Sequence, residues 1–260
     1  MKFILLLAAV LGCALAYPAA EDRVVGGSNA ARNQFPYQAS MQWGLLGIWQ
    51  HVCGGTIISA RTVLTAAHCI TEVPNIGSFR IRAGILLLND ATTIGQTITV
   101  SSNVIHPDYQ GGVNPHDIAL LRLANGLAFG ASIAAAPLPA AGSVPSGVAT
   151  LSGWGSTSST QIPSMPNTLQ FVNTPLITIA LCRSSLISIL GNAGPLHNNN
   201  VCTLGAGQSA CSGDSGGPLT LNGAVIGVVS WGIMPCATPG APSVYGRVSA
   251  YNGWINSNIL

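Results

Sequence analysis

Lysine is almost absent from this 260-residue sequence, in which Lys2 is the only one. The arginines are spread singly along the chain and form no basic run. Proteins that bind nucleic acid concentrate positive charge on one face, so the sequence predicts no nucleic-acid partner. The isoelectric point of about 8.2 therefore says little about partners.

Charged residues of both signs are scarce, at 6% of the chain, whereas 48% of the residues are hydrophobic. Long apolar runs are nevertheless missing after the N-terminus, so no membrane span is expected. Residues 1–16 run from Met1-Lys2 through an apolar stretch to Ala14-Leu15-Ala16, which is typical of a secretory signal peptide. We expect cleavage after Ala16 and a secreted, extracellular product; the alternative is a retained N-terminal anchor.

Metal-binding cysteine pairs of the Cys-x-x-Cys type are also missing. Of the seven cysteines, Cys13 lies in the signal segment, and the six that remain predict three disulfides in an oxidising compartment. The sequence by itself leaves about 15 ways to pair six cysteines. No cofactor is expected.

Short apolar segments separated by Gly, Pro, Ser, Thr and Asn dominate the rest of the chain, and they predict strands of a sandwich or barrel. The predicted strands are residues 56–58, 63–65, 79–83, 97–100, 118–123, 148–151, 219–221 and 225–230. Apolar spacing predicts a C-terminal helix within 248–260, and a short helix is expected to start at Thr178 or Ile179. Residues 134–145 have the composition of a connector between two halves.

Three local segments carry the residue types of nucleophilic catalysis: Ala66-Ala67-His68-Cys69, Asp117-Ile118-Ala119-Leu120 and Gly213-Asp214-Ser215-Gly216-Gly217. A serine hydroxyl becomes a good nucleophile when a neutral imidazole removes its proton. A buried carboxylate fixes the imidazole tautomer and stabilises the imidazolium. Glycines beside the serine allow backbone N–H groups to converge on a carbonyl oxygen.

Together these segments, in the order His, Asp, Ser, resemble the chymotrypsin (S1) family of serine proteases. The resemblance covers the chain from Val24 to the C-terminal helix. It implies an all-β fold of two six-stranded antiparallel Greek-key barrels with a C-terminal helix. The implied domains are a signal peptide (1–16), an activation propeptide (17–23) and a peptidase domain (24–260), the last with barrels at about 24–133 and 134–248 and a helix at about 249–260.

Carried over residue by residue, the resemblance implies that His68 is the general base, Asp117 the orienting carboxylate and Ser215 the nucleophile. The N–H groups of Gly213 and Ser215 match the oxyanion hole. His106 and His116 compete with His68 as bases from the residues alone. His106 precedes a proline in a turn, and His116 adjoins Asp117, where neighbouring strand residues face opposite ways. His68 and Asp117 are therefore preferred.

The resemblance also implies an activation switch. Cleavage after Arg23 frees an ammonium group at Val24, which is expected to pair with Asp214 and order the oxyanion loop. Ser40 and His51 resemble the pair that holds this aspartate in some inactive precursors. A processing scar without a switch role is the alternative.

The family pattern further implies three disulfides: Cys53–Cys69, Cys182–Cys202 and Cys211–Cys236. Calcium-binding members carry paired acids in the loop after the histidine, whereas residues 85–89 have none, so no metal is expected.

By the same resemblance, Ser209 is the floor of the pocket for the residue before the scissile bond. Its walls align with Ser230-Trp231-Gly232 and with Ser243, which is expected to narrow the pocket. Asp214 is the only carboxylate side chain after Cys202, so no partner remains for a substrate Lys or Arg. The pocket predicts cleavage after apolar or aromatic residues, with elastase-like or collagenolytic preference as the alternative.

We therefore expect a monomeric, secreted serine endopeptidase of chymotrypsin-like specificity, and the scarcity of lysine suggests a digestive role. The expected partners are protein or peptide substrates, a trypsin-like activating protease and protein inhibitors. A catalytically inactive homologue that acts as a binding protein is the rival hypothesis. Such proteins commonly lose a triad residue, and none is lost here.

Overall fold

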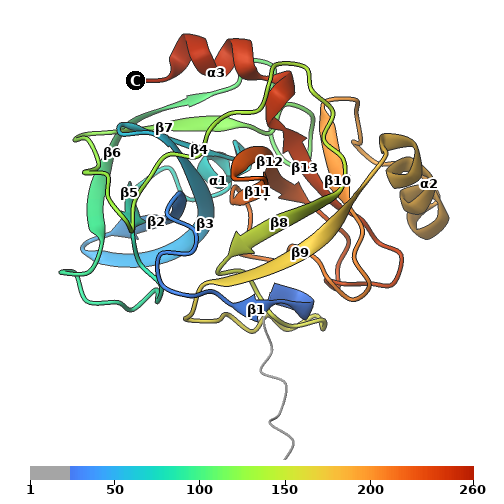
Figure 1. Ribbon diagram of the computed structural model, residues 1–260, viewed down its shortest axis with the longest axis horizontal. Coiled ribbons are helices and arrows are strands. Elements are labelled where there is room, and N and C mark those ends of the chain that lie inside the picture. Colours follow the sequence, from blue (N-terminus) through green and yellow to red (C-terminus); the bar gives the residue numbers. More distant parts are fainter. Residues whose placement is uncertain (1–23) are drawn as a thin grey trace, which may run out of the picture.

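A computed structural model describes residues 24–260 and shows two antiparallel β-barrels side by side (Figure 1). The predicted signal peptide and activation propeptide lie outside the described residues. Within residues 24–260, no helix is long and apolar enough to cross a membrane.

The N-terminal barrel is a closed sheet with the strand order β2-β3-β4-β7-β6-β5. Its strands are β2 (Gln38–Leu45), β3 (Ile48–Ser59), β4 (Thr62–Thr65), β5 (Ser78–Ala83), β6 (Gln96–Ile105) and β7 (Ala119–Leu123). The fully buried Met41, Ile57, Leu64, Ile81 and Leu121 fill its interior. Each strand thus points apolar side chains into the barrel interior, where they pack against those of the neighbouring strands.

The C-terminal barrel has the order β9-β10-β13-β12-β11-β8, and the pairing of β8 with β9 closes it. Its strands are β8 (Val148–Gly153), β9 (Gln170–Ile177), β10 (Asn200–Thr203), β11 (Pro218–Leu221), β12 (Ala224–Trp231) and β13 (Ser243–Arg247). A short strand, β1 (Ser28–Asn29), pairs with β9, so the N-terminal segment lies on this second barrel. The predicted pair of six-stranded barrels is confirmed.

The helices are few and lie outside the barrels. They are α1 (His68–Thr71), α2 (Ile179–Leu190) and α3 (Asn252–Asn258), with 3₁₀ turns η1 (Val24–Gly26) and η2 (Val248–Ala250). Thr178 caps α2, accepting from the Leu181 N–H at 3.2 Å, and Gly191 ends it with a positive φ of 77°. The helix expected at Thr178 or Ile179 is therefore longer than the sequence indicated.

The C-terminal helix ties the end of the chain to the N-terminal barrel. Tyr251 and Ile255 belong to the same buried cluster as Leu121 of that barrel and Val228 of the second. Ser59 donates its hydroxyl to the Leu260 carbonyl at 2.6 Å. One cluster of buried side chains therefore connects α3 with both barrels, and a separate cluster fills the C-terminal barrel.

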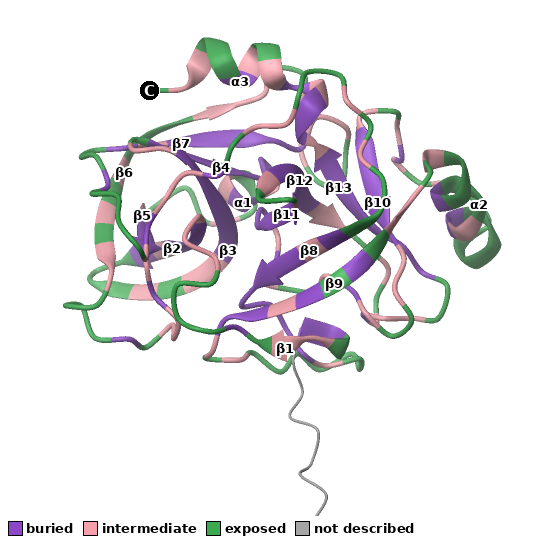
Figure 2. Cartoon of the chain, in the orientation of Figure 1, coloured by how far each residue is buried: buried purple, intermediate pink, exposed green. Residues whose placement is uncertain are grey.

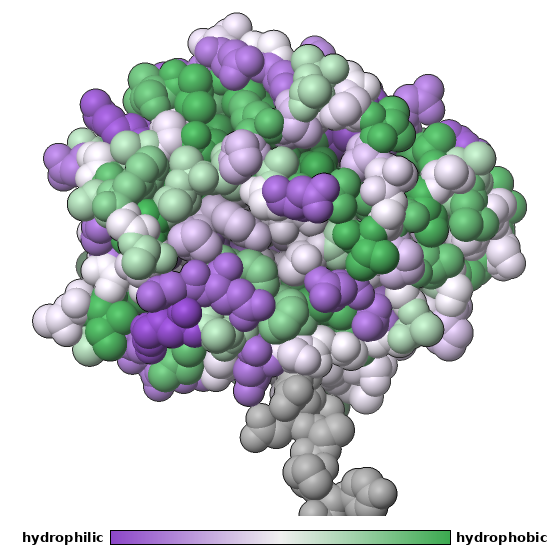
Figure 3. All heavy atoms as spheres, viewed as in Figure 1, coloured by the Kyte–Doolittle hydropathy of each residue, from purple (hydrophilic) through white to green (hydrophobic). Residues whose placement is uncertain are grey.

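Burial inside the barrels accounts for the high share of hydrophobic residues in this chain. The buried residues follow the barrel strands, while the outer face of α2 is exposed (Figure 2). Figure 3 shows hydrophilic and hydrophobic side chains intermixed over the visible face.

Candidate active site

His68 and Asp117 come from the N-terminal barrel and meet at the cleft. His68 begins α1 just beyond β4, and Asp117 lies two residues before β7. His68 Nδ1 lies 2.7 Å from Asp117 Oδ2, and the His68 backbone N–H donates to Asp117 Oδ1 at 2.9 Å. Both carboxylate oxygens thus bind the same residue, which fixes the position and the orientation of the imidazole.

Ser230 reaches this carboxylate from the other barrel. Its hydroxyl, near the end of β12, donates to Asp117 Oδ2 at 2.6 Å. Burial by itself lowers the pKa of His68, but the hydrogen bond and charge of Asp117, with a smaller contribution from Glu72, raise it above its usual value. The imidazole is therefore a stronger base than an isolated histidine in the same place.

Ser215 lies on a sharp turn that only glycines allow. Gly213 and Gly216 have φ values of 96° and 73°, in the left-handed region. A side chain at Gly216 would collide with the Thr65 hydroxyl and the Gly54 carbonyl. The turn is held by bonds from Gly54 N–H to Ser215 O and from Gly216 N–H to Val229 O, each 2.8 Å. The backbone of both barrels thus positions Ser215.

His68 and Ser215 line the same open cavity of about 310 Å³, together with Gly213 and the Cys53–Cys69 disulfide. In residues 24–260, no hydrogen bond joins the Ser215 hydroxyl to His68, and His68 Nε2 lies 3.8 Å from Cys69 Sγ. Bonds of this kind often tighten only when a substrate is bound. The two predicted residues therefore face one site without being in direct contact.

His51 holds the carbonyl of the residue that precedes Asp214. Ser40 Oγ lies 2.9 Å from His51 Nδ1, and His51 Nε2 lies 3.1 Å from the Gly213 carbonyl oxygen. Burial lowers the pKa of His51 to about 4, although the Gly213 bond opposes this, so the ring is neutral and its Nε2–H donates. In this state the Ser40–His51 pair orients Gly213 and contacts its carbonyl, not the Asp214 carboxylate.

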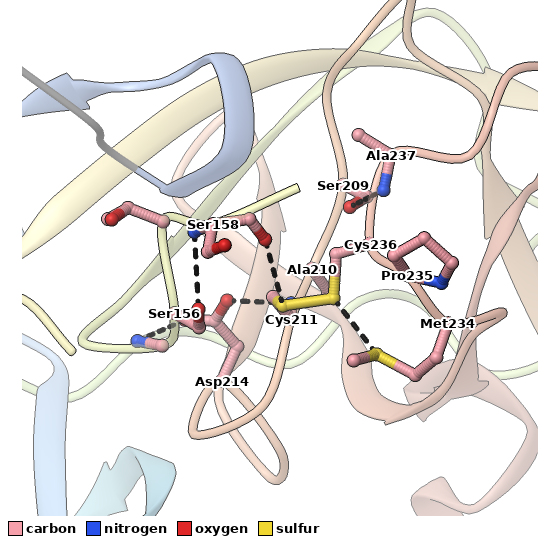
Figure 4. Close-up of a disulfide and its surroundings, with 12 residues drawn as sticks. Ser156, Ser158, Ser209, Ala210, Cys211, Asp214, Met234, Pro235, Cys236 and Ala237 are labelled. Atoms are coloured by element: carbon pink, nitrogen blue, oxygen red, sulfur yellow. Dashed lines mark hydrogen bonds between the residues drawn. A yellow bond between two sulfur atoms is a disulfide. The ribbon is translucent and has the colours of Figure 1, made fainter. Parts of the chain in front are cut away.

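Asp214 is fully buried beneath the nucleophile turn. Its Oδ2 accepts from Cys211 N–H at 3.0 Å (Figure 4), and its Oδ1 accepts from Gly155 N–H at 2.9 Å. Burial raises its pKa to about 6, against the lowering effect of these two bonds. An ionised Asp214 therefore needs a positive partner.

The segment after Arg23 is packed on the same region. Val24 is fully buried in the core of the C-terminal barrel, and Val25 packs on Cys211 and Cys236. Gly26, with a φ of 75°, passes so close to the Gly207 carbonyl that a side chain would not fit. The first described residues thus already lie against the loops that carry Asp214.

A smaller cavity of about 190 Å³ opens beside Ser215. Its lining is mainly apolar or uncharged and includes Ser230, Trp231, Gly232, Ile233, Met234 and the Cys211–Cys236 disulfide. The described walls of this cavity contain no acidic residue. The wall predicted at residues 230–232 is therefore in place, whereas Ile233 and Met234 were missed although they follow it directly.

The predicted floor residue, Ser209, and the predicted wall residue, Ser243, are not among the residues that line this cavity. Ser209 is buried, and its hydroxyl accepts from Ala237 N–H at 2.9 Å (Figure 4). Ser243 is buried too and accepts from Ala210 N–H at 3.2 Å. The Ser209 and Ser243 hydroxyls thus each bind a backbone N–H, and Met234 Sδ lies 3.2 Å from Cys236 Sγ.

The three disulfides pair as the resemblance implied: Cys53–Cys69, Cys182–Cys202 and Cys211–Cys236. The first adjoins His68 and the third borders the pocket. The second links the exposed helix α2 to β10.

The loop at residues 85–89, where a calcium ion was considered, is organised by protein groups. Asp90 Oδ2 accepts from Leu86 and Leu87 N–H at 2.8 and 2.9 Å. The guanidinium of Arg82 donates to the carbonyls of Leu88 and Asp90, both at 2.9 Å. The guanidinium of Arg82 therefore binds carbonyl oxygens of this loop.

Comparison with known proteins adds an independent result. Residues 24–255 match the family model described as Trypsin. The chain is 36% identical over 265 residues to trypsin beta of Drosophila erecta, covering 99% of each chain. It is also 36% identical over 264 residues to trypsin alpha of Drosophila melanogaster and to hypodermin-B of Hypoderma lineatum, covering 99% of this chain and 98% of each relative.

Proposed function

Because the chain belongs to the trypsin family of serine endopeptidases, we propose that His68, Asp117 and Ser215 are its catalytic triad. The observation that carries this proposal is the double contact between His68 and the buried Asp117, which aims the imidazole into the cavity shared with Ser215. This geometry is what a general base needs.

In the proposed mechanism, His68 Nε2 takes the proton of the Ser215 hydroxyl as its oxygen attacks the peptide carbonyl carbon. The N–H groups of Gly213 and Ser215 stabilise the resulting oxyanion. The imidazolium, held by Asp117, then gives its proton to the leaving amine, and an acyl-enzyme remains. His68 then takes a proton from water as the water oxygen attacks the acyl carbon. The imidazolium returns this proton to Ser215 Oγ as the acyl bond breaks, which regenerates the serine and releases the carboxylic acid product.

The substrate preference follows from the pocket. A Lys or Arg side chain in the uncharged cavity beside Ser215 would bury an unpaired cation, which is strongly unfavourable. The relatives are named trypsins, but this chain has Ser209 at the predicted floor and no carboxylate among the lining residues. Cleavage after Phe, Leu or Met is the proposed specificity. An elastase-like or collagenolytic preference is the second candidate, favoured by the small volume of about 190 Å³.

Activation is proposed to begin with cleavage after Arg23. The freed ammonium of Val24 then pairs with Asp214, whose buried carboxylate accepts from two N–H donors within residues 24–260. Because the pocket rejects Arg, the precursor needs a trypsin-like protease and does not process itself. In the uncleaved chain, Ser40 and His51 restrain the oxyanion loop.

The setting of this activity is proposed from the sequence. Residues 1–16 export the chain, residues 17–23 leave on activation, and residues 24–260 act as a secreted monomer. Scarce lysine leaves few sites for trypsin-like enzymes, which suits digestion of dietary protein, and protein inhibitors that present an extended strand to residues 230–232 are the expected regulators.

A phosphonylating reagent directed at reactive serines tests the proposal. After cleavage at Arg23, the reagent is expected to label Ser215 alone, and Ser215→Ala should abolish labelling. A cleaved protein that binds no reagent would support the rival hypothesis of an inactive homologue and overturn the enzyme assignment.

A further inference from the structure

The geometry points to a regulatory site for a divalent transition metal ion such as Zn²⁺, formed by His106, Asp108 and His116 behind the catalytic carboxylate. One ligand atom from each of these residues lies within 4.8 Å of the other two. None of them takes part in the proposed mechanism.

The β6–β7 hairpin explains why these residues meet. Ile105 at the end of β6 pairs with Ala119 at the start of β7, and His106 N–H donates to Ile118 O at 3.1 Å. The two histidines therefore leave the hairpin side by side, and their rings stack with centroids 4.9 Å apart and planes 14° apart. The connecting loop carries Asp108 back toward them.

Each side chain has a donor atom oriented for this role. His106 Nδ1 accepts from the Asp108 backbone N–H at 3.3 Å, a bond that a metal ion would replace, and lies 4.0 Å from Asp108 Oδ2. Asp108 is 69% exposed at its side chain, so its carboxylate is free to turn. His116 Nδ1 is buried and has no hydrogen-bond partner among the described residues. An unpaired buried nitrogen is unfavourable, and metal ligation is one way to satisfy it.

Two imidazole nitrogens and one carboxylate oxygen are a donor set for Zn²⁺, Cu²⁺ or Ni²⁺, not for Ca²⁺ or Mg²⁺. Ligand atoms of a tetrahedral zinc site lie about 3.3 Å apart, given metal–ligand bonds of about 2.0–2.1 Å. The three residues must therefore close by up to about 1.5 Å, and the nearly parallel rings must tilt so that both nitrogens point at one ion.

This tilt connects the site to catalysis. His116 directly precedes Asp117, and its carbonyl accepts from Ile118 N–H at 2.8 Å on the other side of that residue. His116 also has a φ of 64°, which a residue with a side chain seldom adopts. A movement of His116 thus displaces the carboxylate that positions His68, and we expect metal binding to lower activity.

Other groups surround the cluster without belonging to the proposed ligand set. His106 packs on Tyr251 and Trp254, at centroid distances of 5.3 and 5.1 Å. The His197 ring lies 5.8 Å from that of His116. The sequence predicts no metal because the loop at residues 85–89 lacks acids, and this cluster lies elsewhere.

Calorimetric titration of Zn²⁺ into the purified protein tests the site. One ion per chain is expected. Asp108→Asn, an exposed and conservative change, should weaken binding at least about tenfold and leave metal-free activity unchanged. His116→Gln should weaken it further, while His197→Gln should keep the affinity within about threefold.

Metal binding at the catalytic histidine is the alternative outcome, and His68→Ala separates the two sites. The proposal expects His68→Ala to bind Zn²⁺ as the unaltered protein does. Loss of binding in His68→Ala, no binding at all, or full binding in both Asp108→Asn and His116→Gln would overturn the proposed site.

The activity measurement rests on the proposed function, whereas the binding measurement does not. Zn²⁺ should lower kcat with little change in KM, and Asp108→Asn should remove this inhibition at the same ion concentration. Binding without a change in kcat would overturn the coupling to Asp117.

Discussion

The two barrels contribute different kinds of chemistry to one cleft. The N-terminal barrel supplies ionisable side chains, His68 and Asp117, which are fixed by hydrogen bonds to each other. The C-terminal barrel supplies the Ser215 turn, fixed by backbone bonds and glycines, and a pocket whose walls carry no acid in the described chain. The charged half of the cleft is thus His68 with Asp117, and the uncharged half is the pocket beside Ser215, on which the proposed preference for apolar residues rests.

The removal of one residue of the proposed triad should have the largest effect on activity. Ser215→Ala should lower kcat/KM by about 10⁴-fold or more. The triad residues act as a unit, so the loss of one removes most of their combined effect on the rate. Peptide hydrolysis measures this, with the exposed Ser102→Ala as the control. A loss below tenfold in Ser215→Ala would remove this serine from the mechanism.

The buried Asp214 predicts a pH-dependent difference between the precursor and the cleaved protein. Its pKa is raised to about 6 by burial, so its stabilising effect is complete below the ordinary Asp pKa and is lost as the pH rises through 6. The loss amounts to about 3 kcal/mol at pH 7. Pairing with the Val24 ammonium should remove it.

Urea unfolding of both forms at about pH 4 and pH 7 measures this difference. Cleavage after Arg23 should raise the free energy of unfolding more at the higher pH. Asp214→Asn serves as the control, since it cannot ionise. An equal gain at both pH values would contradict the proposed ion pair.

The raised pKa of His68 predicts how kcat/KM depends on pH. Burial lowers this pKa, but Asp117 and, less strongly, Glu72 outweigh it, so kcat/KM should fall about tenfold per pH unit below an apparent pKa above 6.5. Glu72→Gln, at an exposed position, should move that apparent pKa down. An unchanged profile in Glu72→Gln together with an apparent pKa below 6.5 would contradict the assignment.

The smallest effect is expected in the uncharged half. Met234→Ala should enlarge the pocket and raise the ratio of kcat/KM for Phe to that for Leu. The change corresponds to about 1–3 kcal/mol or less in activation free energy. Paired peptide substrates measure the ratio of kcat/KM values, with the exposed Ile162→Ala as the control. If both variants leave the ratio unchanged, Met234 does not shape the pocket.

Much of the fold was predictable because its strands are short, apolar and separated by turn residues. The strands that were not predicted carry mixed patterns: β9 contains Asn173 and Pro175, and β2 begins with Gln38, which is buried because it accepts from Ser152 of the other barrel at 2.7 Å. Such contacts between distant segments leave no local signal in the sequence.

The sequence predicts His68, Asp117 and Ser215 as site residues because each lies in a local segment of characteristic residues. The pocket was harder, since Ser209 and Ser243 turn their hydroxyls to Ala237 and Ala210, and only the folded backbone shows this. The cluster of His106 and His116 was considered only as a source of competing bases, because the sequence does not show that the hairpin stacks the two rings.

The most direct test of the account compares peptides that differ only in the residue before the scissile bond. After activation at Arg23, kcat/KM for Phe or Leu should exceed that for Arg or Lys by at least about 100-fold, because the pocket offers no partner for a buried cation. Cleavage after Arg or Lys at an equal or higher rate would contradict the central claim that the charged half of the cleft serves an uncharged pocket.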